Sequence, residues 1–477
     1  MPYGDLREYL QALEAHGKLH RVTKEVDKDW EISAVGRSTF RRIPAERRPA
    51  LLFERVKGYT IPVLVGALGA SLEVYALALE TTLPGIPGKW EKALANPIPP
   101  VRIATGPCKE NILMEDQVDL GKFPIPTWTA RQDPGPYINL PYVCSKDPED
   151  GSRNVGTYRM QVKGKNKTGL FISTFKNILP HIAKNEKLGR PTPVAVVIGA
   201  DPTIGMTSVA TVPYDVDEFA LSGGLRGAPV ELVKCETSDI EVPATAEIVL
   251  EGEIPPNVRE HEGPFGEHTG YMGPPGDTFV FHIKCITHRN NPIYQGIISL
   301  LPPSESSCIR LAAREFPILK HLRDRLGLPV VDVHLKESGG TGPYLAISMK
   351  KQFPEQVKQV IWGAWSFEPT FGKIVVVVDD DIDIRDANAL DWAICYRMQP
   401  DRDVFIVPEA AAYRLDPSTA PVDVPSHHPS RRIGSKLAMD ATRKHEFPGV
   451  AVPPKEHLDR VWRQWEEYGF PRSYPEY

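Results

Sequence analysis

Apolar residues recur at helical and at strand spacing along the 477-residue chain, and the two periods separate predicted helices from predicted strands. The first predicted helix begins after Asp5, carries Glu8 three residues later as in a capping box, and ends at Gly17. Its apolar face consists of Leu6, Tyr9, Leu10 and Leu13. The segment therefore predicts an amphipathic helix and lacks the continuous apolar core of a signal peptide.

The remainder of the first hundred residues alternates between the two periods. Strands are predicted near Ala50–Phe53 and Ile61–Val65, and a helix over Leu72–Thr82. The proline-rich stretch Thr82–Pro107 then predicts a linker.

From about residue 110 to 300, short β-rich runs are separated by Gly and Pro turns. The predicted strands are Tyr158–Val162, Val194–Ile198, Ile248–Leu250, Phe279–Thr287 and Ile293–Ile298. Helices are predicted near Asn177–Leu188 and Glu218–Leu225. This spacing is typical of a β-barrel or a sandwich.

The last third returns to α/β alternation. A predicted helix over 306–326 precedes it, and Ile374–Val378 is an aliphatic run of the kind buried on both faces of a sheet. Asp386 is predicted to cap a helix over Ala387–Met398, and a Trp-bearing helix over Lys455–Tyr468 closes the chain. We expect an α/β (α+β) protein with an N-terminal α/β region 1–107, a β-rich domain 108–303, a connecting helix 304–327 and a C-terminal α/β domain with a tail, 328–477.

The amino-acid composition excludes several classes of protein but does not indicate a reaction. The net charge of −5 offers no global field for nucleic acid or an anionic membrane, and no apolar run is long enough to span a bilayer. The six cysteines are far apart and form no CxxC pair, which is typical of free thiols in a reducing cytoplasm. The 47 prolines in a chain of ordinary apolar content indicate many irregular loops.

The segment around Glu262 and Glu267 is the strongest candidate for chemistry. Two glycines and Pro264 lie between the two carboxylates, and such a loop lets the backbone approach a ligand closely. Neighbouring acids can split their pKa values, so that one holds a proton near neutral pH. A solvated turn that happens to contain two glutamates is the alternative.

Two further segments carry candidate ligands. Arg159 lies in the middle of a predicted strand, 154–162, where it is either on a wet face or a bidentate clamp for a carboxylate or phosphate. Glu218 opens a predicted helix after Asp215 and Asp217, where it is either a dipole-complementing acid or a ligand for a divalent cation. For the acids that follow the Ile374–Val378 strand, we favour solvation and capping over metal binding; they are Asp379, Asp380, Asp381 and Asp383.

Taken together, these segments resemble the UbiD-type decarboxylases that use prenylated FMN. The matching pieces follow one order over nearly the whole chain: NVGTYRMQV at 154–162, PVAVVIGADP at 193–202, ELVKCETSDIEVPATAEIVLEGEI at 231–254, EGPFGEHTGYMGPPGD at 262–277, THRNNPIYQ at 287–295, KIVVVVDDDIDIRD at 373–386 and SKLAMDATRK at 435–444. The resemblance implies a split β-barrel for the flavin in the middle of the chain and a C-terminal part that drives oligomerisation.

The resemblance also implies residue roles. Glu267 would be the acid/base, and Arg159 would orient the substrate carboxylate. Glu262 would adjust the properties of both of these residues. Asn154 and Glu218 would bind a divalent metal, implied to be Mn²⁺ with a possible K⁺, beside the cofactor phosphate. The implied cofactor contacts are Asn154, Thr157, Tyr158, Arg159, Lys176, Glu218, Ser222 and Lys373.

This chain departs from the family pattern at the third metal ligand. A histidine is implied six residues after Leu170, where the chain has Lys176, and His181 is the nearest alternative. A protonated ammonium has no lone pair for a cation, so Lys176 would instead pair with phosphate as a point charge.

The expected function is therefore reversible, non-oxidative decarboxylation of an aromatic, heteroaromatic or α,β-unsaturated carboxylic acid, with carbon dioxide as the co-product. The expected partners are a flavin prenyltransferase that supplies the cofactor and further copies of this chain in a homodimer or homohexamer, with no nucleic acid or membrane. Two alternatives stay open, a flavin-dependent oxidoreductase on the same barrel and a non-catalytic subunit of a decarboxylase complex.

Overall fold

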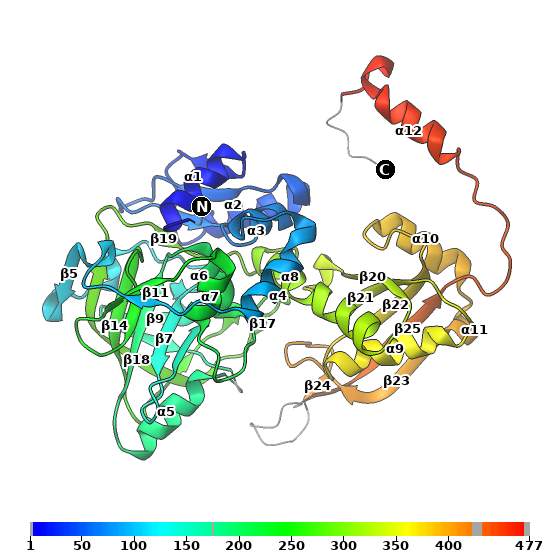
Figure 1. The fold of residues 1–477 in the computed structure, drawn as a ribbon. Coiled ribbons are helices and arrows are strands. Elements are labelled where there is room, and N and C mark those ends of the chain that lie inside the picture. The colour runs from blue at the N-terminus through cyan, green and yellow to red at the C-terminus, as the bar shows by residue number, and fades with distance from the viewer. Residues whose placement is uncertain (1–2, 174–175, 422–431, 472–477) are drawn as a thin grey trace.

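The computed structural model describes residues 3–173, 176–421 and 432–471. Two lobes make up the fold, with helix α8 (Glu305–Lys320) between them (Figure 1). We call residues 3–303 the first lobe and residues 328–441 the C-terminal lobe. Mixed α/β structure, as predicted, fills both lobes.

The N-terminal part of the first lobe forms helices around a small sheet. Its elements are α1 (Leu6–Ala15), β1 (Leu19–Val22), α2 (Glu31–Arg42), β2 (Ala50–Phe53), β3 (Val63–Val65), α3 (Leu72–Ala78), α4 (Ile86–Ala95) and β4 (Val101–Arg102). Helix α1 is capped as predicted, because the Asp5 side chain accepts from the amides of Arg7 and Glu8. The sheet order is β1-β2-β3-β19, so a distant strand, β19 (Tyr294–Gln295), completes it.

The predicted linker Thr82–Pro107 was wrong in part, because it contains α4. Proline occupies the first turn of this helix, where no intrahelical amide donor is required. Buried Ile86 and Ala93 lie on α4, which packs against α7 (Glu218–Arg226). The segment therefore belongs to the packed first lobe.

The rest of the first lobe is built on a large antiparallel sheet of order β6-β9-β10-β18-β14-β11-β7-β8. Its strands are β5 (Asn111–Met114), β6 (Tyr137–Ile138), β7 (Tyr142–Lys146), β8 (Arg153–Thr157), β9 (Met160–Gly164), β10 (Lys167–Leu170), β11 (Thr192–Ile198), β14 (Ile248–Ile254), β15 (Arg259–Glu262) and β18 (Gly276–His288). Smaller elements are α5 (Ile178–Lys187), α6 (Pro202–Val209), β12 (Glu231–Lys234), β13 (Glu241–Pro243), β16 (Phe265–Gly266) and β17 (Met272–Gly273).

A break between β8 and β9 corrects the predicted continuous strand over 154–162. Strand β8 lies at one end of the sheet order and β9 next to the other end, yet only Tyr158 and Arg159 separate them in the chain. The sheet must therefore curl so that its ends approach each other, although strand pairing does not close it. Buried Tyr158 anchors this junction, which leaves Arg159 at the gap.

The C-terminal lobe has a sheet of order β20-β21-β22-β25-β23 with helices on both faces. Its elements are β20 (Val330–Leu335), β21 (Tyr344–Met349), α9 (Gln356–Phe367), β22 (Ile374–Asp379), α10 (Ala387–Arg397), α11 (Pro400–Asp403), β23 (Val404–Ala411), β24 (Ala420–Pro421) and β25 (Arg432–Ala441). Strand β22 is aliphatic and buried, and Asp386 caps α10, both as predicted. Helix α12 (Lys455–Arg463) lies away from both lobes on an extended segment (Figure 1).

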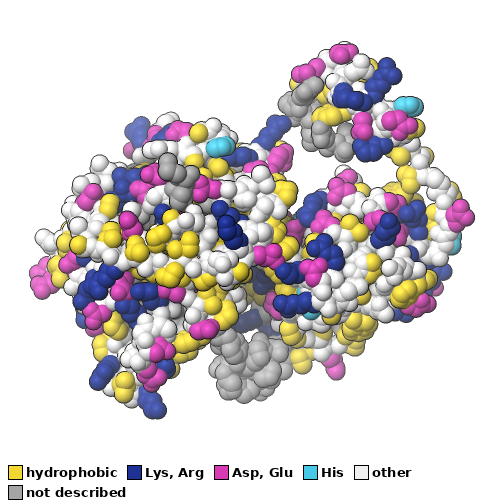
Figure 2. Space-filling view, viewed as in Figure 1, with side chains coloured by type: hydrophobic (Ala, Val, Ile, Leu, Met, Phe, Trp, Pro, Cys, Tyr) yellow, Lys and Arg dark blue, Asp and Glu magenta, His cyan; other side chains and the backbone are white. Residues whose placement is uncertain are grey.

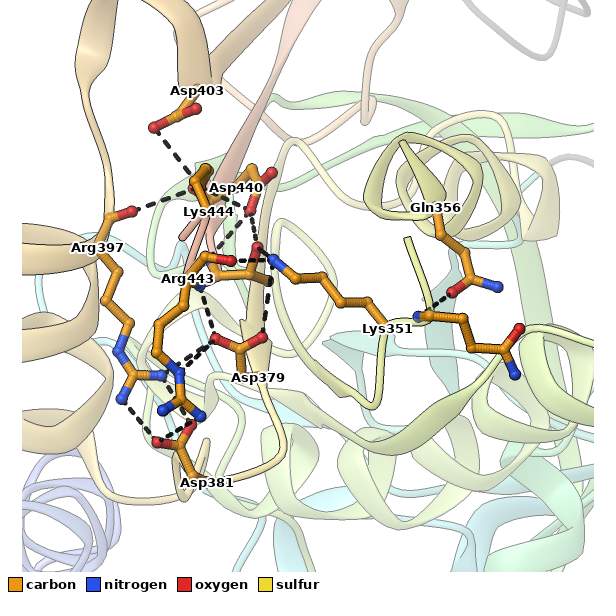
Figure 3. A network of polar contacts seen from close by, with 11 residues as sticks. Lys351, Gln356, Asp379, Asp381, Arg397, Asp403, Asp440, Arg443 and Lys444 are labelled. Carbon is orange, nitrogen blue, oxygen red and sulfur yellow. Dashed lines mark hydrogen bonds and ion pairs between the residues drawn. The ribbon is translucent and has the colours of Figure 1, made fainter. Parts of the chain in front are cut away.

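Two acids of the run at the end of β22, Asp379 and Asp381, are paired with cations. Arg397, whose side chain is 2% exposed, contacts Asp379 at 3.3 Å and binds Asp381 through two bonds of 2.7 and 2.8 Å. The Arg443 amide donates to Asp379 at 2.7 Å, and Lys444 pairs with Asp440 at 2.9 Å (Figure 3). The predicted solvation and capping of this run therefore do not hold for Asp379 and Asp381, which form ion pairs that tie β22 to α10 and to the segment after β25.

The structure also shows the state of the cysteines and the length of the helices. All six cysteines are unpaired, and five of them are buried. Within the described parts of the chain, every helix is too short or too polar to cross a bilayer.

We expect Asp379→Asn to lower the free energy of unfolding by about 1–3 kcal/mol, because it weakens the pairing of a buried guanidinium. Denaturant unfolding measures the change. Asp380→Asn is the control, since Asp380 is exposed. Equal stabilities of the two variants would contradict the structural role of Asp379.

Candidate active site

One guanidinium and two carboxylates from three separate segments meet at the gap in the curled sheet. Arg159 occupies the break after β8, Glu262 ends β15, and Glu267 follows β16 in the turn to β17. Arg159 donates to Glu262 through Nε at 3.1 Å and Nη2 at 3.0 Å, and to Glu267 through Nη1 at 2.5 Å. The structure thus brings together the three residues predicted to be catalytic.

The three charges differ in exposure. Side-chain exposure is 9% for Arg159, 1% for Glu262 and 20% for Glu267. The Arg159 guanidinium carbon lies 4.1 Å from the ring centre of Phe171 and 5.1 Å from that of Phe265, and both rings displace water from it. Glu262 is therefore a fixed partner of Arg159, and Glu267 is the member that a ligand can reach.

Asp133 supports the same loop and was not singled out in the sequence, where its Asp-Pro-Gly context indicates only a turn. Its carboxylate accepts from the amides of Trp128 at 3.1 Å and Thr129 at 2.6 Å. Burial raises the pKa of Asp133 to about 6, against the opposing effect of backbone donors that include the Gly266 amide. Asp133 thus lies against the residue that precedes Glu267.

The buried carboxylate of Glu218 contacts β8, the strand that precedes Arg159. It opens α7 and accepts from the Val155 amide at 2.9 Å, next to Asn154. Burial raises its pKa to about 7. Among the described residues no cation pairs with it, because Arg153 pairs instead with Asp217 at 2.7 Å.

The other predicted ligands of the metal are not assembled around Glu218. Lys176 is accessible to solvent, but partial desolvation and the nearby charge of Arg310 lower its pKa. His181 is buried, and its Nδ1 lies 2.9 Å from the Ser145 hydroxyl. Within the described residues, no three His, Cys, Asp or Glu side chains form a group suited to a metal.

The remaining predicted cofactor contacts bind other protein groups. Thr157 pairs with Ser208 at 2.9 Å, and Ser222 is fully buried and pairs with Thr203 at 2.6 Å. The Tyr158 hydroxyl lies 3.5 Å from the Asn154 amide nitrogen. Lys373 contacts Asp416 at 2.8 Å and Ser418 at 2.7 Å in the C-terminal lobe. The roles of these residues toward a cofactor stay predictions.

A cleft separates the two lobes beside the Glu267 loop (Figure 2). It is open to solvent and is lined by residues of both lobes and of α8. They include His268, Arg310, Arg314, Lys373, Tyr413 and Lys436. Two acids also line the cleft, and they pair with two of these cations: Glu368 with Arg314 at 3.6 Å and Asp416 with Lys373 at 2.8 Å. Arg310 and Lys436 form no ion pair among the described residues, so the lining keeps a positive excess that suits an anionic ligand.

Three family models match consecutive parts of the chain. They describe the 3-octaprenyl-4-hydroxybenzoate carboxy-lyase N-terminal domain (residues 10–92), its Rift-related domain (100–302) and its C-terminal domain (308–441). The chain belongs to the UbiD family. An uncharacterized protein of Archaeoglobus fulgidus is 36% identical, over 97% of this chain and 99% of its own.

Solved structures of UbiD enzymes share the fold. The UbiD-class enzyme HmfF from Pelotomaculum thermopropionicum, in complex with FMN, is 38% identical with a TM-score of 0.83, over 95% of this chain and 98% of its own. Vanillic acid decarboxylase from Sedimentibacter hydroxybenzoicus, in open form, is 30% identical with a TM-score of 0.83, over 98% and 100%. The predicted family resemblance is thus confirmed.

The variant Glu218→Gln tests whether Glu218 carries a buried negative charge that no cation compensates. Because the pKa of Glu218 is about 7 in the folded protein and lower when unfolded, the wild type loses stability as pH rises from about 4.5 to about 7. The glutamine keeps an acceptor for the Val155 amide and does not titrate. The free energy of unfolding of the variant, relative to that of the ligand-free wild type, is expected to increase between pH 5 and pH 8 by up to about 3 kcal/mol.

Unfolding at the two pH values measures that difference. Glu231→Gln, at an exposed position, is the control and should leave the pH dependence unchanged. A Glu218→Gln variant that loses stability in parallel with the wild type would contradict the assignment.

Proposed function

We propose that this UbiD-family protein is a carboxy-lyase that reversibly removes carbon dioxide from an aromatic, heteroaromatic or α,β-unsaturated acid with the help of prenylated FMN. The observation that carries the proposal is the position of Arg159 between Glu262 and Glu267. Glu267 lines a smaller pocket, and the next residue, His268, lines the cleft between the lobes. Relatives support it, since similar structures include a decarboxylase and an enzyme in complex with prenylated FMN.

The chemical difficulty is the electron pair left on an sp² carbon when carbon dioxide departs. Protein side chains cannot delocalise it, and prenylated FMN supplies an electron sink when bound. The chain must then hold the substrate, exclude water and return a proton to the carbon that lost its carboxylate. The balance is one proton consumed and one carbon dioxide released for each turnover.

Arg159 and Glu267 divide these tasks. The two bonds from Arg159 to Glu262 fix the guanidinium, and its Nη1 points to Glu267. A substrate carboxylate that pairs with this Nη1 takes the place of Glu267, which is then free to hold a proton. After carbon dioxide leaves, Glu267 returns the proton to the carbon, and in the reverse direction it removes that proton.

The residues around the cleft fit an anionic cofactor. Lys176 and Arg310 have no hydrogen-bond or ion-pair partner among the described residues, so both are available to a phosphate. Lys373 can also bind the phosphate if it gives up its ion pair with Asp416. We propose that the cofactor contacts are Asn154, Thr157, Tyr158, Arg159, Lys176, Glu218, Ser222 and Lys373, on a split barrel formed by the curled sheet.

The donor set does not fit a three-ligand metal site. Asn154 and Glu218 offer oxygen donors, whereas Lys176 offers an ammonium and His181 is engaged with Ser145. We therefore assign Mn²⁺ and K⁺ no step in the reaction, and we propose that Lys176 supplies positive charge to the phosphate instead.

Further copies of this chain are the proposed partners. The apolar side chains Leu458 and Val461 of α12 are exposed, and none of its described residues is buried. We propose that α12 packs on another subunit of a homodimer or homohexamer, that a flavin prenyltransferase provides the cofactor, and that the protein works in the cytoplasm.

Glu267→Gln is expected to reduce turnover at least 100-fold, because an amide cannot return a proton. The measurement is carbon dioxide release from a panel of aromatic, heteroaromatic and acrylic acids, after coexpression with a flavin prenyltransferase. The flavin spectrum should match that of the wild type.

Glu260→Gln, on β15 and paired with Lys163 and Lys167, is the matched control and should keep wild-type activity. Turnover by Glu267→Gln at the wild-type rate would contradict the proposed acid/base role of Glu267. A colourless wild type would instead favour a non-catalytic subunit, and hydride transfer from NAD(P)H would favour an oxidoreductase.

Metal analysis of flavin-loaded protein tests the role of Lys176. Less than about 0.1 manganese per chain is expected, because two oxygen donors alone hold a cation weakly. Lys176→Gln should weaken flavin retention, because the phosphate loses a positive charge, and should add no metal. Stoichiometric manganese in the wild type would refute the proposal.

A further inference from the structure

His268, directly after Glu267, is held from the C-terminal lobe. Its Nε2 lies 3.0 Å from the hydroxyl of Tyr413, which follows β23. The two rings meet edge to face, with centroids 5.8 Å apart and planes at 67°. Because 145 residues separate the two in sequence, this contact joins the lobes.

A second segment of the C-terminal lobe reaches the same residue. A Cβ on Gly340, between β20 and β21, would lie 3.2 Å from the His268 carbonyl oxygen and 3.4 Å from Pro302. Gly340 also has a φ of +71°, which disfavours any other residue. The C-terminal lobe therefore packs directly against the main chain beside Glu267.

The tautomer of the neutral His268 ring decides the direction of its hydrogen bond with Tyr413. Burial, together with the charges of Arg310 and Arg314, holds the pKa of His268 well below its usual range, so the ring is neutral. Its Nδ1 lies 4.0 Å from Glu267 Oε2. With the proton on Nδ1, toward the carboxylate, Nε2 accepts from the Tyr413 hydroxyl.

Glu267 and the residue that follows it are therefore held by different lobes. Arg159 fixes its carboxylate from the first lobe, and Glu267 also donates its amide to the Tyr271 carbonyl at 2.9 Å. The Tyr413 hydroxyl constrains the next residue from the other side. If the lobes separate, the second constraint is lost while the first remains.

We propose that Tyr413 is a positioning residue that acts through His268 to set the orientation of Glu267 when the lobes are together. The acid is then correctly placed only when the C-terminal lobe is docked. This inference rests on the proposed role of Glu267 as acid/base.

Tyr413→Phe removes the hydroxyl and keeps the ring. In the flavin-loaded enzyme, kcat is expected to fall about tenfold, the effect of one hydrogen bond, with KM changed by less than about twofold. In a His268→Leu background the same change should cause no further loss. Tyr396→Phe, at an exposed position on α10, is the control.

Hydrogen exchange measured by mass spectrometry gives a second readout that needs no turnover. Amides in residues 264–272 should exchange several times faster in Tyr413→Phe than in the wild type or Tyr396→Phe. Unchanged exchange there, or an unchanged kcat in an active enzyme, would overturn the positioning role. A wild type without decarboxylase activity but with the expected exchange would count against the proposed function alone.

Discussion

The pairing of one buried guanidinium with two carboxylates is the constraint on which the site depends. Arg159 can meet both only because the chain breaks between β8 and β9, and because β15 and the β16–β17 turn bring the acids to the same gap. A buried ion set of this kind is costly unless every partner is present. The two carboxylates differ in exposure: Glu262 is buried and fixed, whereas a ligand can reach Glu267.

The C-terminal lobe adds residues to the site beyond those that the large sheet of the first lobe provides. Helix α8 links the lobes, and its buried Glu305 accepts backbone amides of Gly66, Leu68 and Ile298 from the first lobe. From the same helix, Arg310 and Arg314 face the cleft. The cleft is thus lined by groups whose spacing depends on how the two lobes are packed.

Sequence patterns predicted the features that local chemistry determines. The Asp5 cap, the aliphatic β22 and the Asp386 cap each follow from a few adjacent residues, and all three are confirmed. The break at Arg159 was missed, because Thr157–Val162 has the alternation of a continuous strand and only the path of the whole sheet requires the break. The pairing of Lys373 with Asp416, and of His268 with Tyr413, depends on packing between distant segments, which no local pattern encodes.

Decarboxylation in heavy water tests the central claim, that this site replaces a carboxylate by a proton from an exchangeable acid. Flavin-loaded wild type should release one carbon dioxide per product and place one deuterium on the carbon that carried the carboxylate. Mass spectrometry and NMR of the product measure both. A product without deuterium at that carbon, or an oxidised product formed without carbon dioxide, would contradict the account.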